Sequence, residues 1–127
     1  RDNKQAASAY ALVKQTLARH PQNTELMSEL AMVCEKLKRY DEMESLLREI
    51  IKRKPDDPHA FNALGYSLAD RNIRLPEARL LITQALKLAP NDAYIQDSLG
   101  WVAFRQGQLA EALQLLQRRE EEQDLIQ

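Results

Sequence analysis

The sequence predicts an all-α protein, a solenoid of about seven helices that stack as antiparallel pairs. The strongest indication is a period: Pro21, Pro55 and Pro90 lie 34 and 35 residues apart (55 − 21 = 34; 90 − 55 = 35). A fixed period of this length is typical of helix pairs that stack on one another. Only 3 Gly and 5 Pro occur in 127 residues, which favours long regular elements joined by short turns.

The period divides the chain into a partial repeat and three full repeats. We expect residues 4–23 to hold the second helix of the partial repeat, and the full repeats to be 24–57, 58–92 and 93–126. Residues 1–127 would then form a single solenoid, which we expect to be a fragment of a longer protein. The expected helices are 4–19, 24–37, 41–53, 58–71, 76–88, 92–106 and 109–123.

The first helix of each full repeat carries a leucine followed by a small residue. These pairs are Leu30-Ala31, Leu64-Gly65 and Leu99-Gly100. Glycine inside a helix costs about 1 kcal/mol relative to alanine, so its recurrence needs a packing reason. We therefore expect the two helices of a pair to approach closely there. Asp57 before Pro58 has the pattern of an N-cap followed by proline at the first helical position.

The second helices carry Ala9, Met43, Ala78 and Ala112 at matching places. Asp41 with Glu44 has the form of a capping box for the helix at 41–53. The segment 71–76 holds one extra residue, which should lengthen the turn inside the second repeat. Gly107 falls in the turn of the last repeat, where a positive φ suits glycine. The last repeat lacks a closing proline, so its second helix can continue through 118–122.

These patterns resemble the tetratricopeptide repeat, a pair of helices with a period of about 34 residues. The resemblance is carried by FNALGYSLADRNIRLPEARLLITQALKLAP (61–90) and DSLGWVAFRQGQLAEALQLLQ (97–117). In the second repeat the family's small and helix-ending positions are filled by Leu64, Gly65, Ala78, Ala85 and Pro90. The first repeat departs from the pattern, with larger residues at Ala31, Met43 and Ile50. The resemblance covers nearly the whole chain and implies a right-handed superhelix.

The second and third repeats are also similar to tetratricopeptide proteins of Gram-negative bacteria. Some of these are envelope lipoproteins that scaffold proteases and cell-wall hydrolases. This likeness implies a bacterial cytoplasm or periplasm, with association to the envelope, and leaves the compartment open.

In this family the first helix of each pair lines the concave face, so the resemblance implies a binding groove there. The positions carried over are Glu25, Ser28, Met32 and Glu35, then His59, Asn62, Tyr66 and Asp70, then Tyr94, Asp97, Trp101 and Arg105. Met32 and the eight residues of the second and third repeats are the candidate partner-binding site. Met32, Tyr66 and Trp101 occupy equivalent positions and would form a row of binding anchors.

Two interpretations of the aromatic residues remain open. Tyr66 and Trp101 either face the groove or pack against the neighbouring helix, while Phe61 and Phe104 are expected in the core. The family's clamp for a partner's C-terminal carboxylate uses Lys, Asn and Arg. This chain has neither Lys nor Arg at the matching positions, which are Ser28, Met32, Ala63, Tyr94 and Ser98. An extended or helical apolar segment is therefore the expected ligand.

Charge and motifs argue against several other functional classes. The 18 basic and 19 acidic residues give a net charge of −1, which disfavours nucleic acid as a partner. No apolar run is long enough to insert into a membrane. His20 and His59 lack metal-ligand spacing, and no catalytic or phosphate-binding motif is present, so no metal or cofactor is expected. Cys34 is expected to be a buried thiol.

The leading hypothesis is a non-enzymatic module that binds a protein or peptide segment in the concave groove. One alternative is a structural spacer within a larger repeat protein. A second is a helical-repeat RNA binder, which the charge balance opposes. The ends of the solenoid could also self-associate, because the helix at 4–19 carries a face that normally meets a preceding helix: Ala9, Leu12, Val13 and Thr16.

Overall fold

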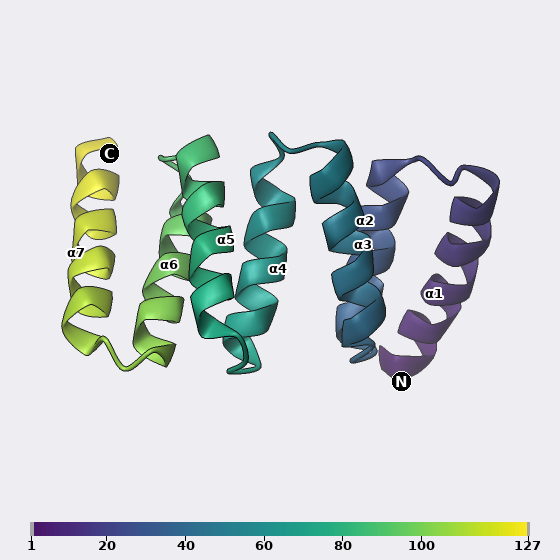
Figure 1. Ribbon diagram of the computed structural model, residues 1–127, viewed down its shortest axis with the longest axis horizontal. Helices are drawn as coiled ribbons and strands as arrows, with labels where there is room; N and C mark the ends of the chain where they lie inside the picture. The colour runs from purple at the N-terminus through teal and green to yellow at the C-terminus, as the bar shows by residue number, and fades with distance from the viewer. Residues whose placement is uncertain (1, 127) are drawn as a thin grey trace. The chain divides into compact units, whose positions relative to one another are not determined.

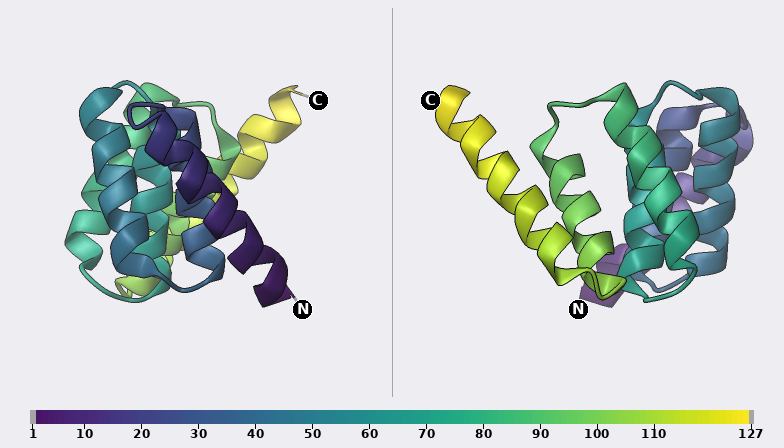
Figure 2. Two further views of the ribbon diagram at one scale, coloured as in Figure 1. Left: turned by 90° about the vertical axis from the view of Figure 1, so that its right-hand side faces the viewer. Right: turned by 60° about the vertical axis from the view of Figure 1, so that its left-hand side comes forward.

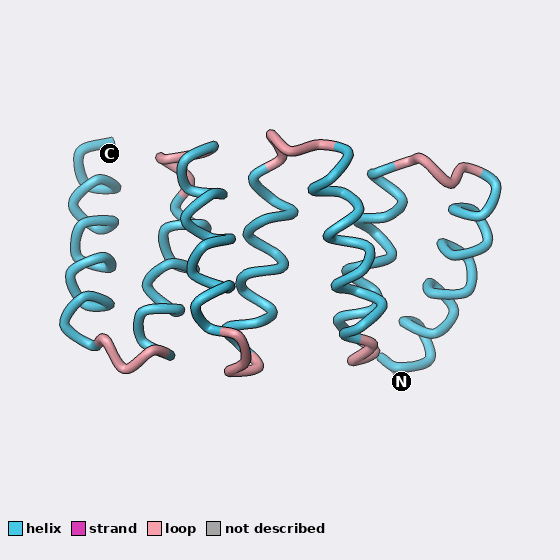
Figure 3. The backbone as a smooth tube through the Cα atoms, in the orientation of Figure 1, coloured by secondary structure: helices cyan, strands magenta, loops and turns pink. Residues whose placement is uncertain are grey.

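The computed structural model describes residues 2–126, which form seven α-helices and no strand (Figures 1 and 3). The helices are α1 (Asp2–Arg19), α2 (Thr24–Lys36), α3 (Tyr40–Arg53), α4 (Pro58–Asp70), α5 (Leu75–Leu88), α6 (Ala93–Arg105) and α7 (Leu109–Ile126). All seven expected helices are confirmed. The largest difference at a boundary is three residues, at the end of α7 (126 − 123 = 3).

The helices divide into two compact parts, residues 1–55 and 56–127. In the first part α2 packs against both α1 and α3. In the second part α4 packs against α5 and α6, and α6 also packs against α5 and α7. Of the residues at the matching place on the second helices, Met43, Ala78 and Ala112 are buried and Ala9 is half-buried. Cys34 is fully buried, as the sequence predicts.

The turn that leads into each full repeat has the same construction three times. Asn23, Asp57 and Asp92 each lie two residues after the periodic proline and just before a first helix. Their side-chain oxygens accept hydrogen bonds from the backbone N–H of Leu26 (3.0 Å), His59 (2.9 Å) and Tyr94 (2.9 Å). Proline thus ends one helix and the cap begins the next. The cap expected at Asp57 is confirmed.

The turn inside each repeat is also conserved in geometry. Lys38, Asn72 and Gly107 all have left-handed backbones, with φ of 60°, 58° and 78°. In each turn the following residue's N–H bonds back to the helix: Arg39 to Cys34 O (2.8 Å), Ile73 to Leu68 O (3.0 Å) and Gln108 to Ala103 O (2.9 Å). This is the Schellman arrangement of a helix C-terminus. The extra residue of the second repeat is accommodated at Arg74, which has a φ of 44°.

The capping box expected at Asp41 and Glu44 is wrong. Helix α3 begins at Tyr40, and Arg39 at its N-cap makes no side-chain capping bond with the described residues. Asp41 therefore lies inside the first turn, where its charge still suits the positive end of the helix dipole. Glu44 instead accepts from Arg48 Nη2 at 2.7 Å, one turn further along.

The close approach expected at the two helical glycines occurs at one of them. A Cβ on Gly65 would lie 2.6 Å from Ile82 Cγ1 and 2.9 Å from the Ala78 carbonyl oxygen, so α4 and α5 leave no room for a side chain. A Cβ on Gly100 would meet Leu116 at 3.6 Å, an ordinary van der Waals distance. Figure 2 shows the reason, because α7 diverges from α6 toward its C-terminal end.

Polar contacts tie the helix pairs together in each part. In the first part, Glu42 of α3 accepts from Tyr10 Oη of α1 at 2.7 Å, from Arg39 Nε at 3.2 Å and from Lys14 Nζ at 3.4 Å. Burial alone would raise the pKa of Glu42, but the hydrogen bonds from Tyr10 and Arg39 and the charge of Lys14 outweigh it and lower the pKa. Glu42 is therefore ionised at neutral pH and holds α1 against α3.

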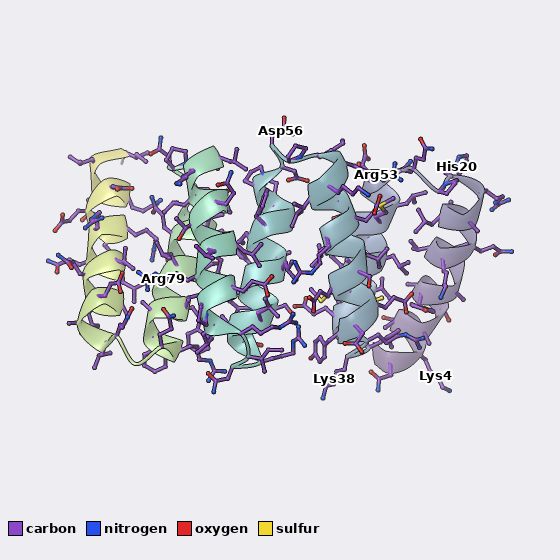
Figure 4. All side chains as sticks on the ribbon, in the orientation of Figure 1. Lys4, His20, Lys38, Arg53, Asp56 and Arg79 are labelled. Atoms are coloured by element: carbon purple, nitrogen blue, oxygen red, sulfur yellow. The ribbon has the colours of Figure 1, made fainter. Side chains whose placement is uncertain are left out.

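In the second part, Arg79 of α5 reaches the turn between α6 and α7; Figure 4 labels its position. Its Nη1 donates to Gln106 Oε1 at 3.0 Å and to Gln108 Oε1 at 2.8 Å. Its Nη2 pairs with Glu111 at the start of α7. The N-terminal end of α7 is thereby held against α5, while its C-terminal end diverges from α6.

Candidate functional site

The second compact part has a hollow of about 270 Å³ between α4 and α6. It is lined by Tyr66 from α4 and by Tyr94, Asp97, Ser98 and Trp101 from α6. Four of the nine expected site residues thus come together: Tyr66, Tyr94, Asp97 and Trp101. Tyr66 and Trp101 are equivalent in the repeat (101 − 66 = 35), so the packing of α4 beside α6 brings their rings to one place.

The aromatic residues of the hollow remain partly accessible. Tyr66 and Trp101 are half-buried, and Tyr94 is 69% exposed. The rings of Tyr66 and Trp101 are therefore packed against other residues and still leave part of their surface accessible. Ser98 at the hollow is buried and donates from Oγ to the Tyr94 carbonyl oxygen at 3.1 Å, which satisfies its hydroxyl within α6.

The Trp101 ring is held in place by its neighbours one turn along α6. Phe104 stacks on it with ring centroids 5.5 Å apart and planes 17° from parallel. The Arg105 guanidinium carbon lies 4.8 Å from the Trp101 ring centroid, and Arg105 Nη2 donates to the Asp70 carbonyl oxygen at 2.7 Å. Arg105 thus ties α6 to the end of α4 and fixes the indole between two side chains.

The expectation that Phe104 lies in the core is wrong, because its side chain is 50% exposed. Phe104 has the same place in its repeat as Ala69 (104 − 69 = 35), which is fully buried. Within residues 2–126, no further helix pair covers the side of α6 that carries Phe104. Phe61 is half-buried, as a residue at the edge of the core.

Three buried polar atoms of α4 and α6 near the hollow have no hydrogen-bond partner among the described residues. They are Asn62 Oδ1, an acceptor, and the donors Trp101 Nε1 and Arg105 Nε. Asn62 is only 4% exposed and lies one helical turn before Tyr66 on α4. An unsatisfied buried group costs about 1–3 kcal/mol, and Trp101 is the one of these residues that lines the hollow.

The charged groups beside the hollow are partly engaged. Asp97 forms an ion pair with Arg119 of α7, although Arg119 Nε is not aligned for a hydrogen bond. Arg105 is held by Trp101 and Asp70, as described above. The hollow therefore offers aromatic surface beside charged groups, of which Arg105 Nε and Arg119 Nε have no hydrogen-bond partner among the described residues.

The other expected site residues lie outside the hollow. His59 and Asp70 are exposed on α4, and Asn62 and Arg105 adjoin the hollow without lining it. Met32 belongs to the first compact part, where its side chain is 56% exposed on α2. Ser98 was not identified from the sequence as a lining residue. It was named only as one of the positions at which the family's carboxylate clamp is missing.

A second kind of hollow recurs in both parts where two successive second helices meet a first helix. The two hollows measure about 460 Å³ and about 190 Å³. Six lining positions correspond, each pair 69 residues apart (86 − 17 = 69): Leu17 and Leu86, Pro21 and Pro90, Met27 and Gln96, Leu30 and Leu99, Leu46 and Leu115, Glu49 and Arg118.

The side chains that line these two recurring hollows differ in polarity and charge. Met27 is replaced by the polar Gln96, and the charge of Glu49 is reversed at Arg118. A hollow that recurs at the same place in the repeat with different side chains results from the way the helix pairs stack. We therefore assign no ligand to it.

Other reactive groups carry no site. Burial raises the pKa of the Cys34 thiol, which disfavours the nucleophilic thiolate. Within residues 2–126, no three His, Cys, Asp or Glu side chains are grouped so as to hold a metal ion. The same residues include no helix with the length and apolarity needed to cross a bilayer.

The repeated caps and turns define a class, the helical-repeat proteins built from stacked helix pairs. Within that class, the tetratricopeptide repeat matches residues 1–65, and a second form of the same repeat matches residues 44–93 and 63–124. The chain belongs to the tetratricopeptide-repeat family.

Relatives and solved structures agree with this assignment. The TPR repeat-containing protein PA4667 of Pseudomonas aeruginosa is 43% identical over 117 residues, which cover 92% of this chain. The chain spans only 20% of that protein's length. MamA residues 41–end from Desulfovibrio magneticus RS-1 gives a TM-score of 0.83 at 19% identity, over 93% of this chain and 66% of that one. MamA of MSR-1 gives 0.81 at 21% identity, over 97% and 70%. Such low identities show a shared fold alone.

Proposed function

We propose that this chain is a non-enzymatic module that binds a peptide or protein segment in the hollow between α4 and α6. Tetratricopeptide-repeat folds support protein–protein interaction in general, and their members are typically scaffolds rather than enzymes. The proposal adds a place on this chain and a kind of ligand to that general role.

The observation that supports it is the convergence of three accessible aromatic rings on one hollow. Tyr66, Tyr94 and Trp101 supply rigid amphipathic surface at low cost in side-chain entropy, which is what binding anchors require. At about 270 Å³ the hollow has room for a side chain or two of a peptide.

The test is a selection of peptides from a random display library on the chain, followed by affinity measurements on variants. We expect Tyr66→Ala and Trp101→Ala each to weaken binding of the selected peptides by at least about tenfold, as for anchor residues at other interfaces. Circular dichroism should show unchanged helicity in both variants.

Leu80→Ala is the matched control. Leu80 is an apolar side chain, 72% exposed on α5, and it does not line the hollow. Its removal should leave the affinity unchanged. If Tyr66→Ala and Trp101→Ala unfold the chain, the rings are core residues and the proposed site is wrong. If no peptide is selected at all, the structural-spacer role replaces the binding role.

A further inference from the structure

Helix α7 carries a row of exposed leucines. Leu109, Leu113 and Leu116 follow one another at intervals of four and three residues, so they share one face of the helix, and all three are exposed. On α5 the residue equivalent to Leu116 is Ile82 (116 − 82 = 34), which is fully buried where α5 packs against both α4 and α6. The leucine row of α7 is therefore a stacking face that the described residues leave open.

Helix α1 has an exposed face made mostly of short side chains. Ala6 on the opposite side is buried, where α1 packs against α2. The exposed face holds Ser8, Ala11 and Gln15, with Leu12 beside them. Helices pack by fitting the ridges of one into the grooves of the other, so protruding leucines suit a row of shorter residues. The face of α1 therefore complements the leucine row of α7 in shape.

The two helices also carry opposite charge. Helix α7 has five acidic and two basic residues (2 − 5 = −3), whereas α1 has three basic and one acidic residue (3 − 1 = +2). Glu120 continues the leucine row one turn further along α7, and Lys4 continues the α1 face one turn before Ser8. Neither charge is paired with another residue that the structure describes. Two α7 faces would therefore repel each other, whereas α7 and α1 attract.

We propose that the leucine face of α7 binds the α1 face of a second copy of this chain, with the two helices antiparallel. When Leu113 lies over Ala11, a step of seven residues along each helix brings Glu120 beside Lys4 (113 + 7 = 120; 11 − 7 = 4). The steps match because the rise per residue is the same in both helices. Apolar packing and the ion pair are thus made in one register.

The contact joins two different faces, so it is heterologous. After two copies associate, one α7 face and one α1 face are still free, and assembly continues beyond the dimer. The leucine row includes none of the residues that line the hollow between α4 and α6. The inference is therefore independent of the proposed function.

Analytical ultracentrifugation of the chain tests the inference. We expect the average mass to rise with protein concentration past that of a dimer. Leu12→Glu removes the α1 face and Leu113→Glu the α7 face, both at exposed positions, so each variant should fold and remain a monomer. Circular dichroism checks that both are folded. Leu80→Glu is the control, because Leu80 is exposed on α5 outside both faces, and it should assemble like the unsubstituted chain.

A mixture of the two monomeric variants tests the pairing of the faces. The Leu12→Glu copy keeps an intact α7 face, and the Leu113→Glu copy keeps an intact α1 face. The mixture should therefore form a dimer with one copy of each and stop there.

Charge reversal tests the register. Lys4→Glu should weaken assembly roughly two- to fivefold, the range of an exposed ion pair. Adding Glu120→Lys to the same chain should restore it. Failure to restore assembly would overturn the antiparallel register.

Three results would overturn the contact itself. A chain that stays a monomer at about 1 mM has no such interface. Assembly of Leu12→Glu alone would mean that α1 is not the occupant of the α7 face. Assembly of Leu113→Glu alone would mean that copies associate without the leucine row.

Discussion

The two helical glycines occupy the same position in successive repeats but have opposite tolerance for a side chain. Alanine gains about 1 kcal/mol over glycine in a helix interior. At Gly65 this gain is outweighed, because a Cβ would lie 2.6 Å from Ile82 and 2.9 Å from the backbone of Ala78. Overpacking of this kind costs about 1–3 kcal/mol, and more when backbone must move.

We therefore expect Gly65→Ala to lower the free energy of unfolding by about 1–2 kcal/mol. Gly100→Ala is the matched variant, and it should raise the free energy by up to about 1 kcal/mol because its Cβ meets only ordinary contacts. Urea denaturation of both proteins measures the difference. The same sign for both substitutions would contradict the account of how α4–α5 and α6–α7 differ.

Glu42 makes the stability of the first compact part dependent on pH. Its pKa is lowered in the folded chain, so it stabilises the fold above the carboxyl's ordinary pKa, and this stability is lost as pH falls through the folded pKa. Glu42→Gln should therefore cost about 1–2 kcal/mol at neutral pH. The difference from the unsubstituted chain should shrink below about pH 4.

Urea denaturation at neutral and acid pH checks this expectation. The control is Glu49→Gln, because Glu49 pairs only with Arg53 one turn away at the surface (2.6 Å) among the ion pairs described. That substitution should cost at most about 0.5 kcal/mol at neutral pH. An equal cost for both substitutions would mean that the contacts from Tyr10, Lys14 and Arg39 do not favour the Glu42 carboxylate.

At the scale of elements, the left-handed turns within the repeats differ in how well their residues suit them. Gly107 adopts a positive φ at no steric cost, Asn72 tolerates it, and Lys38 is strained by it. Lys38→Gly should stabilise the chain by about 0.5–1 kcal/mol, and Asn72→Gly by less.

Thermal or urea denaturation measures these gains. Lys52→Gly serves as the control, because Lys52 lies in the last turn of α3 and its substitution should lower the free energy of unfolding by up to about 1 kcal/mol. If Lys38→Gly destabilised the chain as much as Lys52→Gly does, the left-handed turn after α2 would be incorrect.

Helix α7 is the least anchored element of the second compact part. Among the described residues, α7 buries Ala112, whereas α5 buries Ala78, Ile82 and Ala85. Local opening is easiest where few apolar side chains are buried. We expect backbone amides in the C-terminal half of α7 to exchange with solvent at least about tenfold faster than those of α5. Hydrogen exchange followed by NMR would show this, and equal protection of the two helices would contradict it.

At the scale of the whole molecule, the helix order was predictable because the signals that set it are local and repeated. Prolines at 21, 55 and 90 end helices, and the caps that follow begin the next ones. A positive φ was predicted from the sequence at Gly107 alone. Asn72 also carries a signal, because asparagine tolerates the left-handed backbone, whereas Lys38 carries none. The clue to a left-handed backbone at Lys38 was its position one repeat before Asn72 (72 − 38 = 34).

The candidate site was less predictable, because it depends on how far helices lie from one another. The repeat register placed Tyr66, Tyr94, Asp97 and Trp101 on facing helices, and they line one hollow. The exposure of Phe104 and the looser contact at Gly100 follow from what covers α6 and from the divergence of α7. Neither of these is encoded in a local pattern.

The central claim is that ligands bind at the aromatic hollow between α4 and α6. The most direct measurement is the NMR signal of the Trp101 indole N–H, which is unique because the chain has a single Trp. On titration with a peptide selected from the library, we expect this signal to shift downfield and to saturate with the bound fraction. Binding of a selected peptide that leaves the indole signal and the amides of Tyr66, Tyr94 and Asp97 unmoved would contradict the claim.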